Sequence, residues 1–516
     1  MTDALWPVEQ ALVDHVERGD LLELTDDVHI RAWVVRDVLR GRLAPAPDPH
    51  GLRIKGARIV GRLDLENVTS AIGLELEDCV LAEGVIARDA QLPAFTLVGC
   101  RLEHPDEPAL DADRIRVEQV LLCDNVQATT GGTRAAISLA NAKIGGSLIC
   151  RDVRLRNTTG PALNATGLHT GRDVQLHGFD AVGAGKSGTF VLADAHVCGH
   201  LKCAATTLRN DSGPALMADG LQVDGRVLWG PGFTAAGAGG QGAARLLLAE
   251  FGGWQGHGVI ISNDSGPGLL AGGLRVERDV MLKDFAATGG AHGVAADLTE
   301  VTVGGGLYLT LSRLDHADPA HRLRVDRLVY SGVPLGIGAG EWLTLLREGT
   351  PEYEAQPYQQ LAAGHRAAGH DREARRALMA QRRDQIDRRA LTGRGERAWA
   401  RFTGLTLGYG YQPWRALLVL LAVLVTSALL AVVLGGTGLV QPRAGASPVT
   451  CPVIDRIAVG LELGAPLITT PARVRCEATN SGAGQALTIA GWVLRLLAWA
   501  FATLFIAGFT GAVRRT

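Results

Sequence analysis

A short pattern repeats seven times along the chain, and this periodicity limits the possible folds more than any other feature. The copies are spaced by 26 or 27 residues and begin at Ile144, Thr170, Val197, Val223, Glu250, Val276 and Val303. Apolar residues stand four and six positions after each start, and only the copy with Trp254 and Gly256 departs. Residues two apart share one face of a β-strand. A unit of this length buries that face by stacking on the next unit, which predicts a parallel β-solenoid, a mainly β fold.

A second repeat marks every other coil. Asn157 opens the turn Asn-Thr-Thr-Gly-Pro, and Asn210 and Asn263 each open the turn Asn-Asp-Ser-Gly-Pro, at intervals of 53 residues. Because two copies of the shorter repeat fit into each interval, we expect one such corner in every two coils. Less regular copies lie upstream, for example in Gly56–Leu65. We therefore predict a β-solenoid over residues 49–335, with roughly ten to twelve coils of about 26.5 residues.

The residues before the solenoid are expected to cover its first coil. Apolar residues recur in two groups: Leu12, Val16, Leu21, Leu22 and Leu24, and then Val28, Ile30, Val34, Val35 and Leu39. They predict an N-terminal helical cap, residues 1–48, with two short amphipathic helices. Such a cap would cover strand edges that otherwise favour aggregation. The first residues lack a charged segment followed by an apolar run, so we expect no cleaved export signal and a cytosolic solenoid.

Two apolar segments near the C-terminus are long enough to cross a membrane. Residues 416–435 contain no charge, and the second segment, about 490–512, is interrupted only by Arg495. About 20 apolar residues span the roughly 30 Å of hydrocarbon in a bilayer. We therefore predict a two-helix transmembrane hairpin within residues 413–516, with an extracytoplasmic loop. Arg495 either extends to the membrane interface or faces a bundle interior or a pore.

Residues 336–412 are predicted to form a basic helical neck beside the membrane. Tyr358, Leu361, Ala362 and His365 share one helix face, Gly369 ends the pattern, and a second, arginine-rich helix follows over Arg372–Arg389. The simplest interpretation of the arginines is a solvated helix that lies against anionic lipid headgroups.

The placement of the arginines also predicts the orientation. Ten arginines stand between Arg372 and Arg401, Arg415 borders the first span, and Arg514 and Arg515 follow the second. The loop between the spans has only Arg443, Arg456, Arg473 and Arg475. The positive-inside rule then places both termini in the cytoplasm. We expect a multi-pass protein of the inner, or plasma, membrane.

The eight cysteines fall into two groups. Six lie in the solenoid, where Cys150 and Cys203 share one inward repeat position and are expected to stay reduced, as small apolar side chains. Cys451 and Cys476 lie in the loop between the apolar segments. Because that loop is predicted to face an oxidising medium, we predict a disulfide between these two residues.

Two segments have the composition of ligand sites. Gly183–Gly188 matches Gly-x-Gly-x-x-Gly, but the corresponding corner Gly237–Gly242 is also glycine-rich, so we interpret both as turns of the repeat and not as nucleotide sites. His196, Cys198 and His200 are weak candidates for a metal site. On one strand they would lie about 6–7 Å apart, too far to hold one zinc ion by themselves. Polar residues on a solvated strand face are the simpler interpretation.

The residues do not point to an enzyme. Outward acids would suit a carbohydrate-cleaving groove, but their spacing defines no acid and base pair. They are Asp64, Asp152, Asp173, Asp224 and Asp279. We therefore assign no catalytic and no cofactor-binding residue, and we expect no cofactor. The net charge of −2 gives no global reason to expect a nucleic acid as partner.

Three stretches resemble a group of actinobacterial membrane proteins. They are Gly51–Leu65, Tyr358–Ala362 together with Ala367–Arg376, and Gly408–Arg415. The resemblance spans most of the chain and implies a cytosolic solenoid akin to pentapeptide-repeat proteins, a helical neck and two C-terminal spans. Such proteins are often labelled membrane-associated oxidoreductases, which implies a redox enzyme. The sequence has no flavin, nicotinamide or haem signature, so no catalytic residue is carried over.

These patterns favour a non-enzymatic interaction scaffold, with a cytosolic solenoid held at the bilayer by the hairpin. The expected partners are the lipid bilayer and proteins bound along the solenoid face, and a homo-oligomer is compatible with the pattern. The alternative is an oligomeric two-span channel or mechanosensitive element, because the segment 455–470 between the spans has the length of a short re-entrant helix. It lacks a Thr-Val-Gly-Tyr-Gly filter. An oxidoreductase follows from the resemblance alone.

Overall fold

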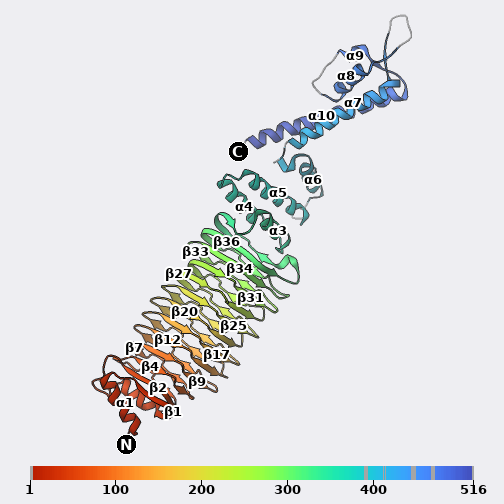
Figure 1. Cartoon of the computed structure of the whole chain (residues 1–516). Helices are drawn as coiled ribbons and strands as arrows, with labels where there is room; N and C mark the ends of the chain where they lie inside the picture. The colour runs from red at the N-terminus through yellow and green to blue at the C-terminus, as the bar shows by residue number, and fades with distance from the viewer. Residues whose placement is uncertain are drawn as a thin grey trace. The chain divides into compact units, whose positions relative to one another are not determined.

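The computed structural model describes residues 4–388, 393–410, 412, 414–442, 449–465 and 471–513. They belong to two compact units, Met1–Ala374 and Arg375–Thr516. The first unit is a parallel β-solenoid with helices at its two ends (Figure 1). The predicted fold class is confirmed.

One strand from each coil forms an eleven-stranded parallel sheet. Its strands are β3 (Leu63–Asp64), β6 (Val85–Ile86), β10 (Leu110–Asp111), β14 (Ile137–Ser138), β18 (Leu163–Asn164), β22 (Phe190–Val191), β26 (Leu216–Met217), β29 (Ala244–Arg245), β32 (Leu269–Leu270), β35 (Ala296–Asp297) and β37 (Leu323–Arg324). Eleven coils with a strand in this sheet agree with the roughly ten to twelve coils that the repeat predicts.

The other strands of the solenoid form three further ladders, which long strands join into one 27-stranded sheet. They are β1 (Leu22–Arg31), β2 (Leu52–Val60), β4 (Leu74–Glu77), β5 (Val80–Leu81), β7 (Gln91–Leu92), β8 (Phe95–Val98), β9 (Arg101–His104), β11 (Arg116–Val117), β12 (Leu121–Asp124), β13 (Gln127–Thr130), β15 (Lys143–Ile144), β16 (Leu148–Arg151), β17 (Arg154–Asn157), β19 (His169–Thr170), β20 (Val174–His177), β21 (Asp180–Gly183), β23 (His196–Val197), β24 (Leu201–Ala204), β25 (Thr207–Asn210), β27 (Gln222–Trp229), β28 (Thr234–Gly237), β30 (Glu250–His257), β31 (Ile260–Asn263), β33 (Arg275–Val276), β34 (Val280–Thr288), β36 (Thr302–Asp315) and β38 (Val329–Leu335). A short 3₁₀ helix, η1 (Pro319–His321), lies between β36 and β37.

The inward positions of the repeat are where the sequence places them. Cys123, Cys150, Leu176 and Cys203 are Cα partners in successive coils, and all four side chains are buried. The core of the solenoid is therefore a stack of aliphatic and thiol side chains, and each coil is stabilised mainly by its two neighbours.

One repeat is displaced by a residue from its predicted start. Val223 is level with Phe251 and not with Glu250, because the pairing of β27 with β30 shifts between Val223 and Arg226. Trp229 stacks on Phe233 with ring centroids 4.5 Å apart and meets Trp254 edge-on at 5.2 Å. The irregular copy is thus the place where the thin aliphatic core widens into an aromatic cluster.

The asparagine corners alternate with glycines, which explains the two-coil period. Gly183 is the Cα partner of Asn210, and Gly237 is the partner of Asn263. Asn210 Nδ2 donates to the carbonyls of Gly185 and Pro214, and its Oδ1 accepts the N–H groups of Ser212 and Gly213 at 3.0 and 2.8 Å. A Cβ at Gly237 would stand 2.7 Å from Ala243 Cα. The coils with Gly183 and Gly237 therefore have no room for a side chain at this corner.

The N-terminal cap differs from the two predicted helices. It consists of α1 (Pro7–Arg18), the strand β1 and α2 (Ala32–Leu39). The residues from Leu22 to Ile30 are strand, because β1 pairs in parallel with β2 at the open edge of the first coil. Ladder hydrogen bonds to β2 decide the conformation of a segment whose apolar residues fit a helix less well than a strand. The cap still has its expected role, since β1 covers the open edge of β2.

Helices follow the last coil. α3 (Ala339–Glu348) and α4 (Gln356–Ala367) lie in the first unit, and α5 (Asp371–Asp387) crosses the division between the units. The four residues predicted to share a face of α4, Tyr358, Leu361, Ala362 and His365, are buried. Gly369, with φ at +76°, separates α4 from α5 as expected.

The second unit contains two long apolar helices, α7 (Trp414–Gly438) and α10 (Gly482–Val513), which pack against each other. They include the predicted spans 416–435 and 490–512, and both are long and apolar enough to cross a membrane. Only 11% and 17% of their most apolar stretches are buried, whereas a soluble core helix would be mostly buried.

The remaining elements of the second unit are short. α6 (Arg394–Leu407) and the 3₁₀ turn η2 (Gly408–Gly410) precede α7, and α8 (Val453–Gly464) and α9 (Ala472–Arg475) lie between α7 and α10. β39 (Leu439–Gln441) pairs antiparallel with β40 (Val449–Thr450) and β41 (Glu477–Ala478). The described residues between the apolar helices thus form a small domain, and α8 packs against α7.

Candidate functional site

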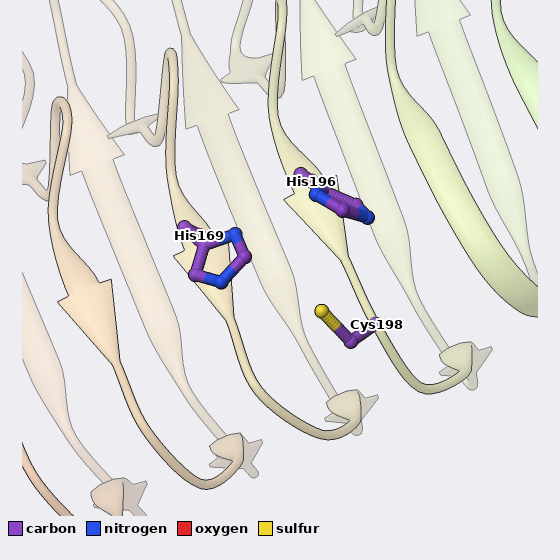
Figure 2. Close-up of side chains that lie close together, drawn as sticks. All are labelled: His169, His196 and Cys198. Atoms are coloured by element: carbon purple, nitrogen blue, oxygen red, sulfur yellow. The ribbon is translucent and has the colours of Figure 1, made fainter.

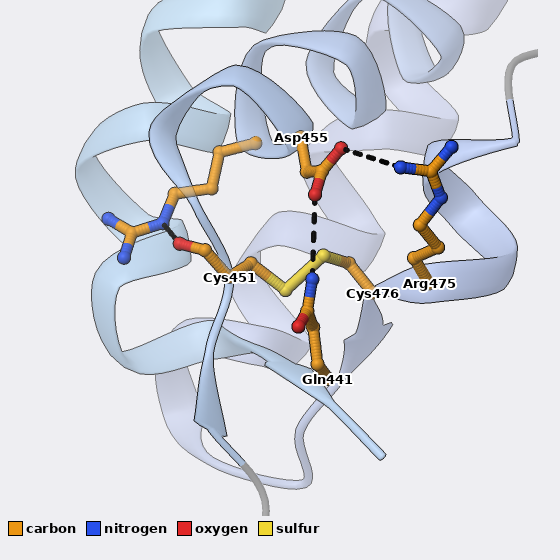
Figure 3. The surroundings of a disulfide bond; sticks show 6 residues. Gln441, Cys451, Asp455, Arg475 and Cys476 are labelled. Atoms are coloured by element: carbon orange, nitrogen blue, oxygen red, sulfur yellow. Dashed lines mark hydrogen bonds and ion pairs between the residues drawn. A yellow bond between two sulfur atoms is a disulfide. The ribbon is translucent and has the colours of Figure 1, made fainter. Parts of the chain in front are cut away.

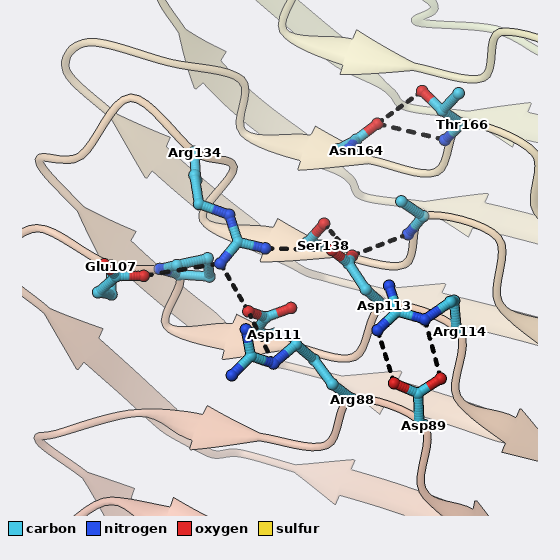
Figure 4. A network of polar contacts seen from close by, with 12 residues as sticks. Arg88, Asp89, Glu107, Asp111, Asp113, Arg114, Arg134, Ser138, Asn164 and Thr166 are labelled. Atoms are coloured by element: carbon cyan, nitrogen blue, oxygen red, sulfur yellow. Dashed lines mark hydrogen bonds and ion pairs between the residues drawn. The ribbon is translucent and has the colours of Figure 1, made fainter. Parts of the chain in front are cut away.

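Charged side chains of the early coils, both buried and exposed, bond from one coil to the next (Figure 4). Arg134 donates to Asp111 at 2.7 Å and to Asp113 at 3.1 Å. Asp113 also accepts the Ser138 hydroxyl and the Ala140 N–H. The Asp111 side chain is only 2% exposed and has Arg88 3.9 Å away on its other side. Because acids and bases alternate here, the charges compensate one another and the network holds neighbouring coils together.

A groove of about 480 Å³ opens beside this network. Its lining residues are Asn67, Thr69, Asp89, Gln91, Arg114, Arg116, Asn141 and Lys143. Asp89 accepts two bonds from Arg114, at 2.8 and 2.6 Å, and this pairing lowers the pKa of Asp89. Arg116 and Lys143 are neighbours in the ladder and exposed, and neither has an ion-pair partner among the described residues. The groove therefore has two uncompensated positive charges.

Among the outward acids named above, Asp64, Asp173 and Asp279 each have a local partner. Asp64 pairs with Arg36, and Asp279 accepts the N–H of Gly306 at 2.8 Å. Asp173 accepts Lys202 Nζ at 2.5 Å and the His200 N–H at 2.9 Å. Burial alone would raise the pKa of Asp173, but these two donors lower it below its ordinary value. These contacts are those of carboxylates that link coils.

His169, which was not among the predicted metal candidates, lies beside two of them. Figure 2 shows His169 beside His196 and Cys198. One ligand atom from each of the three residues lies within 4.8 Å of the other two. His169 and His196 are Cα partners on β19 and β23, and their ring centroids are 5.2 Å apart. Both stand immediately before a repeat start, so the 27-residue spacing contained the signal that brings them together.

His200 lies outside this group. Its Nδ1 accepts the backbone N–H of Arg226 at 2.9 Å, so that nitrogen is already used in the stacking of coils. Cys198 also differs from the other solenoid cysteines, because Cys79, Cys100, Cys123, Cys150 and Cys203 are buried and Cys198 is partly exposed. His196 Nε2 is 3.0 Å from Asp224 Oδ1, one coil further on.

The glycine-rich loop at Gly183–Gly188 is a corner of the solenoid. It connects β21 with β22, so a strand and not a helix follows it. A dinucleotide or phosphate loop places its anion at the N-terminus of a following helix. This geometry agrees with the interpretation of the motif as a turn.

The second unit contains the predicted cysteine pair (Figure 3). Cys451 and Cys476 are joined by a disulfide, with a Cα–Cα distance of 6.2 Å. Both residues are buried. Asp455 lies close by, 3.4 Å from Gln441 Nε2 and 3.9 Å from Arg475 Nη1, and Arg456 Nε donates to the Cys451 carbonyl at 2.7 Å. The bond therefore ties β40 and α8 to the segment that leads into β41 and α10.

The arginines predicted to mark the membrane have different positions. Arg415 lies in the first turn of α7. Arg495, within α10, donates to the Glu462 carbonyl near the C-terminus of α8 at 3.3 Å. A cation at a helix C-terminus is favourable because carbonyl groups there lack helical partners. Arg514 and Arg515 lie outside the described residues.

Comparisons with protein-family models, with curated proteins and with solved structures found no match.

Proposed function

We propose that this protein is a non-enzymatic scaffold, anchored in the inner membrane by α7 and α10, whose cytosolic solenoid binds a protein partner. The observation that carries the proposal is the groove at Arg116 and Lys143, two paired positions of one ladder of the solenoid. The two poorly buried apolar helices of the same chain support the membrane anchor. A ladder of regularly spaced outward side chains is the kind of extended surface that solenoids use for binding.

The partner we propose presents carboxylates. Two uncompensated cations in a polar groove attract an acidic segment and orient it by complementary charge. The whole chain has a net charge of −2, which disfavours a nucleic acid as the partner. Lipid is the second partner, through the apolar helices and the arginines of α5.

The orientation we propose has both termini in the cytoplasm and the disulfide-bonded domain outside. The arginines before α7 support it, as does the disulfide, because such bonds persist in oxidising compartments. After reduction of intact cells, a membrane-impermeant maleimide should label Cys451 and Cys476 and leave Cys198 unlabelled. Labelling of Cys198 alone would show the opposite orientation and contradict this proposal.

Site-specific photo-crosslinking in living cells tests the scaffold. A photoreactive residue at Gln91 or Asn141, on the rim of the groove, should give one adduct with an acidic protein, and Arg116→Glu should abolish it. The matched control is Gln222, an exposed ladder position far along the solenoid, which should give no such adduct. Equal crosslinking at Gln222, or an RNA adduct at the groove, would refute the proposal.

A channel remains the second candidate, because α8 lies between the two apolar helices in sequence and packs against α7. It requires several copies around an axis to enclose an aqueous path. A monomer in detergent without conductance in bilayers would reject it. The redox activity implied by the resemblance stays a prediction to which we assign no residue.

A further inference from the structure

We propose that His169, His196 and Cys198 form a binding site for a divalent transition-metal ion, with Zn²⁺ as the expected occupant. His169 lies on β19, His196 lies on β23 of the next coil, and Cys198 lies in the turn that follows β23. One possible ligand atom from each residue lies within 4.8 Å of the other two. Imidazole nitrogen and thiolate sulfur are the ligands that zinc prefers.

The distances between the three ligand atoms, all within 4.8 Å, need to shorten only slightly to hold a zinc ion. Bonds of about 2.0–2.3 Å at tetrahedral angles put zinc ligand atoms about 3.3–3.8 Å apart. Rotations of the His169 and Cys198 side chains, which are exposed and partly exposed, can supply the difference. The backbone is already held, because His169 and His196 are paired in the ladder and the Cys198 N–H donates to the Thr170 carbonyl at 3.0 Å.

Asp224 orients His196 for this purpose. A carboxylate only accepts hydrogen bonds, so Nε2 of His196 carries the proton in the 3.0 Å contact with Asp224 Oδ1. Nδ1 is then the nitrogen with a free lone pair. This carboxylate–histidine arrangement is the common support of a metal-bound imidazole, because it fixes the tautomer and the ring orientation. Asp224 is thus a positioning residue from a third coil.

Metal binding would displace the thiol proton of Cys198 and leave a fourth coordination position to water. The ion would link two coils and, through Asp224, a third. Cys198 is suited to this role because it is the partly exposed thiol among the free cysteines that the structure describes.

The test is a Co²⁺ titration of the untagged full chain in detergent, followed by competition with Zn²⁺. We expect one equivalent of Co²⁺, with visible bands of tetrahedral cobalt and a thiolate-to-cobalt charge-transfer band. Cys198→Ser should remove the charge-transfer band. His169→Gln should weaken binding at least about tenfold, and Asp224→Asn about 10–100-fold.

His200→Gln and His177→Gln are the matched controls, because they remove solenoid histidines outside the group. Both should bind as the unaltered chain does. Circular dichroism checks that each variant is folded. The absence of tetrahedral cobalt bands in the unaltered chain would overturn the proposal. So would a Co²⁺ affinity of Cys198→Ser and His169→Gln equal to that of the unaltered chain.

Discussion

At the scale of single residues, the corner asparagines show how one side chain can stabilise a coil. Asn157, Asn210 and Asn263 are almost fully buried, and each uses its amide to satisfy backbone groups of its own turn and of the preceding coil. A buried backbone group without a partner is costly, so each asparagine replaces hydrogen bonds that strand pairing cannot supply at the corner.

Asn210→Ala is therefore expected to destabilise the solenoid. The variant leaves the N–H groups of Ser212 and Gly213 and the carbonyls of Gly185 and Pro214 without the amide, which should cost about 1–3 kcal/mol. Denaturant unfolding of the full chain in detergent measures the shift of the midpoint. Gln222→Ala, at an exposed ladder position, is the control and should change stability little. Equal shifts would contradict this account of the corner.

Thiol reactivity should separate Cys198 from the buried cysteines. Burial raises the pKa of Cys203 to about 12, so almost none of it is thiolate near neutral pH. A short exposure of the native, metal-free chain to maleimide should modify Cys198 and spare Cys203. Peptide mass spectrometry gives the sites, and denaturation before labelling should make both react. Modification of Cys203 at the rate of Cys198 in the folded chain would refute the prediction.

At the scale of elements, α4 combines a predicted face with an unexpected property. Both ring nitrogens of the buried His365 are without a hydrogen-bond partner among the described residues. Burial lowers the pKa of His365, the nearby His370 lowers it further, and Glu373 acts in the opposite direction. The helix therefore packs with a neutral imidazole.

This arrangement predicts an acid-sensitive contact. An unfolded histidine has a pKa of about 6.5, and the pKa of His365 in the folded chain is lower, so the unfolded chain binds more protons between the two values. The contribution of His365 is complete above about pH 6.5 and is lost as the pH falls towards the folded pKa. His365→Phe should therefore lose less thermal stability between pH 7.5 and pH 5.5 than the unaltered chain. An identical loss in both would contradict the prediction.

Element boundaries show what the sequence could and could not predict. The spacing of inward residues such as Cys150 and Cys203 defined the ladders, because a stacked repeat must bury the same positions in each coil. The strand β1 was missed because the helical pattern was extended over Leu22, Leu24, Val28 and Ile30, although their two-residue spacing already favours a strand that pairs with β2. The shift at Phe251 lies in the coils where Trp229 and Trp254 pack together, and spacing alone does not show it.

The candidate site was predictable only in part for the same reason. Alternation correctly placed His196 and Cys198 outward, but it treated one strand in isolation. His169 joins them through the parallel register between coils, and His200 turns away to accept a backbone N–H. Contacts between coils therefore decide the chemistry of this surface more than the order of residues along one strand.

At the scale of the whole molecule, the disulfide-bonded domain and the solenoid should respond differently to reduction. The bond closes a segment with a sequence separation of 25 between Cys451 and Cys476. Loss of such a cross-link typically costs about 2–4 kcal/mol. A Cys451→Ser/Cys476→Ser chain should have a second unit that unfolds at lower temperature in detergent, detected by limited proteolysis. Cys198→Ser is the control, and equal thermal resistance in all chains would contradict the prediction.

The alternation of asparagine and glycine corners has a consequence for how such a chain can change its length. Removal of residues 158–210 joins Asn157 to Asp211 and deletes two coils, so that asparagine and glycine corners still alternate. Removal of residues 158–183 deletes one coil and its glycine corner, so that two asparagine corners become neighbours. We expect the first deletion to give a folded chain by circular dichroism and the second to aggregate. The length of this solenoid can then change by whole pairs of coils, about 10 Å each, and not by single coils.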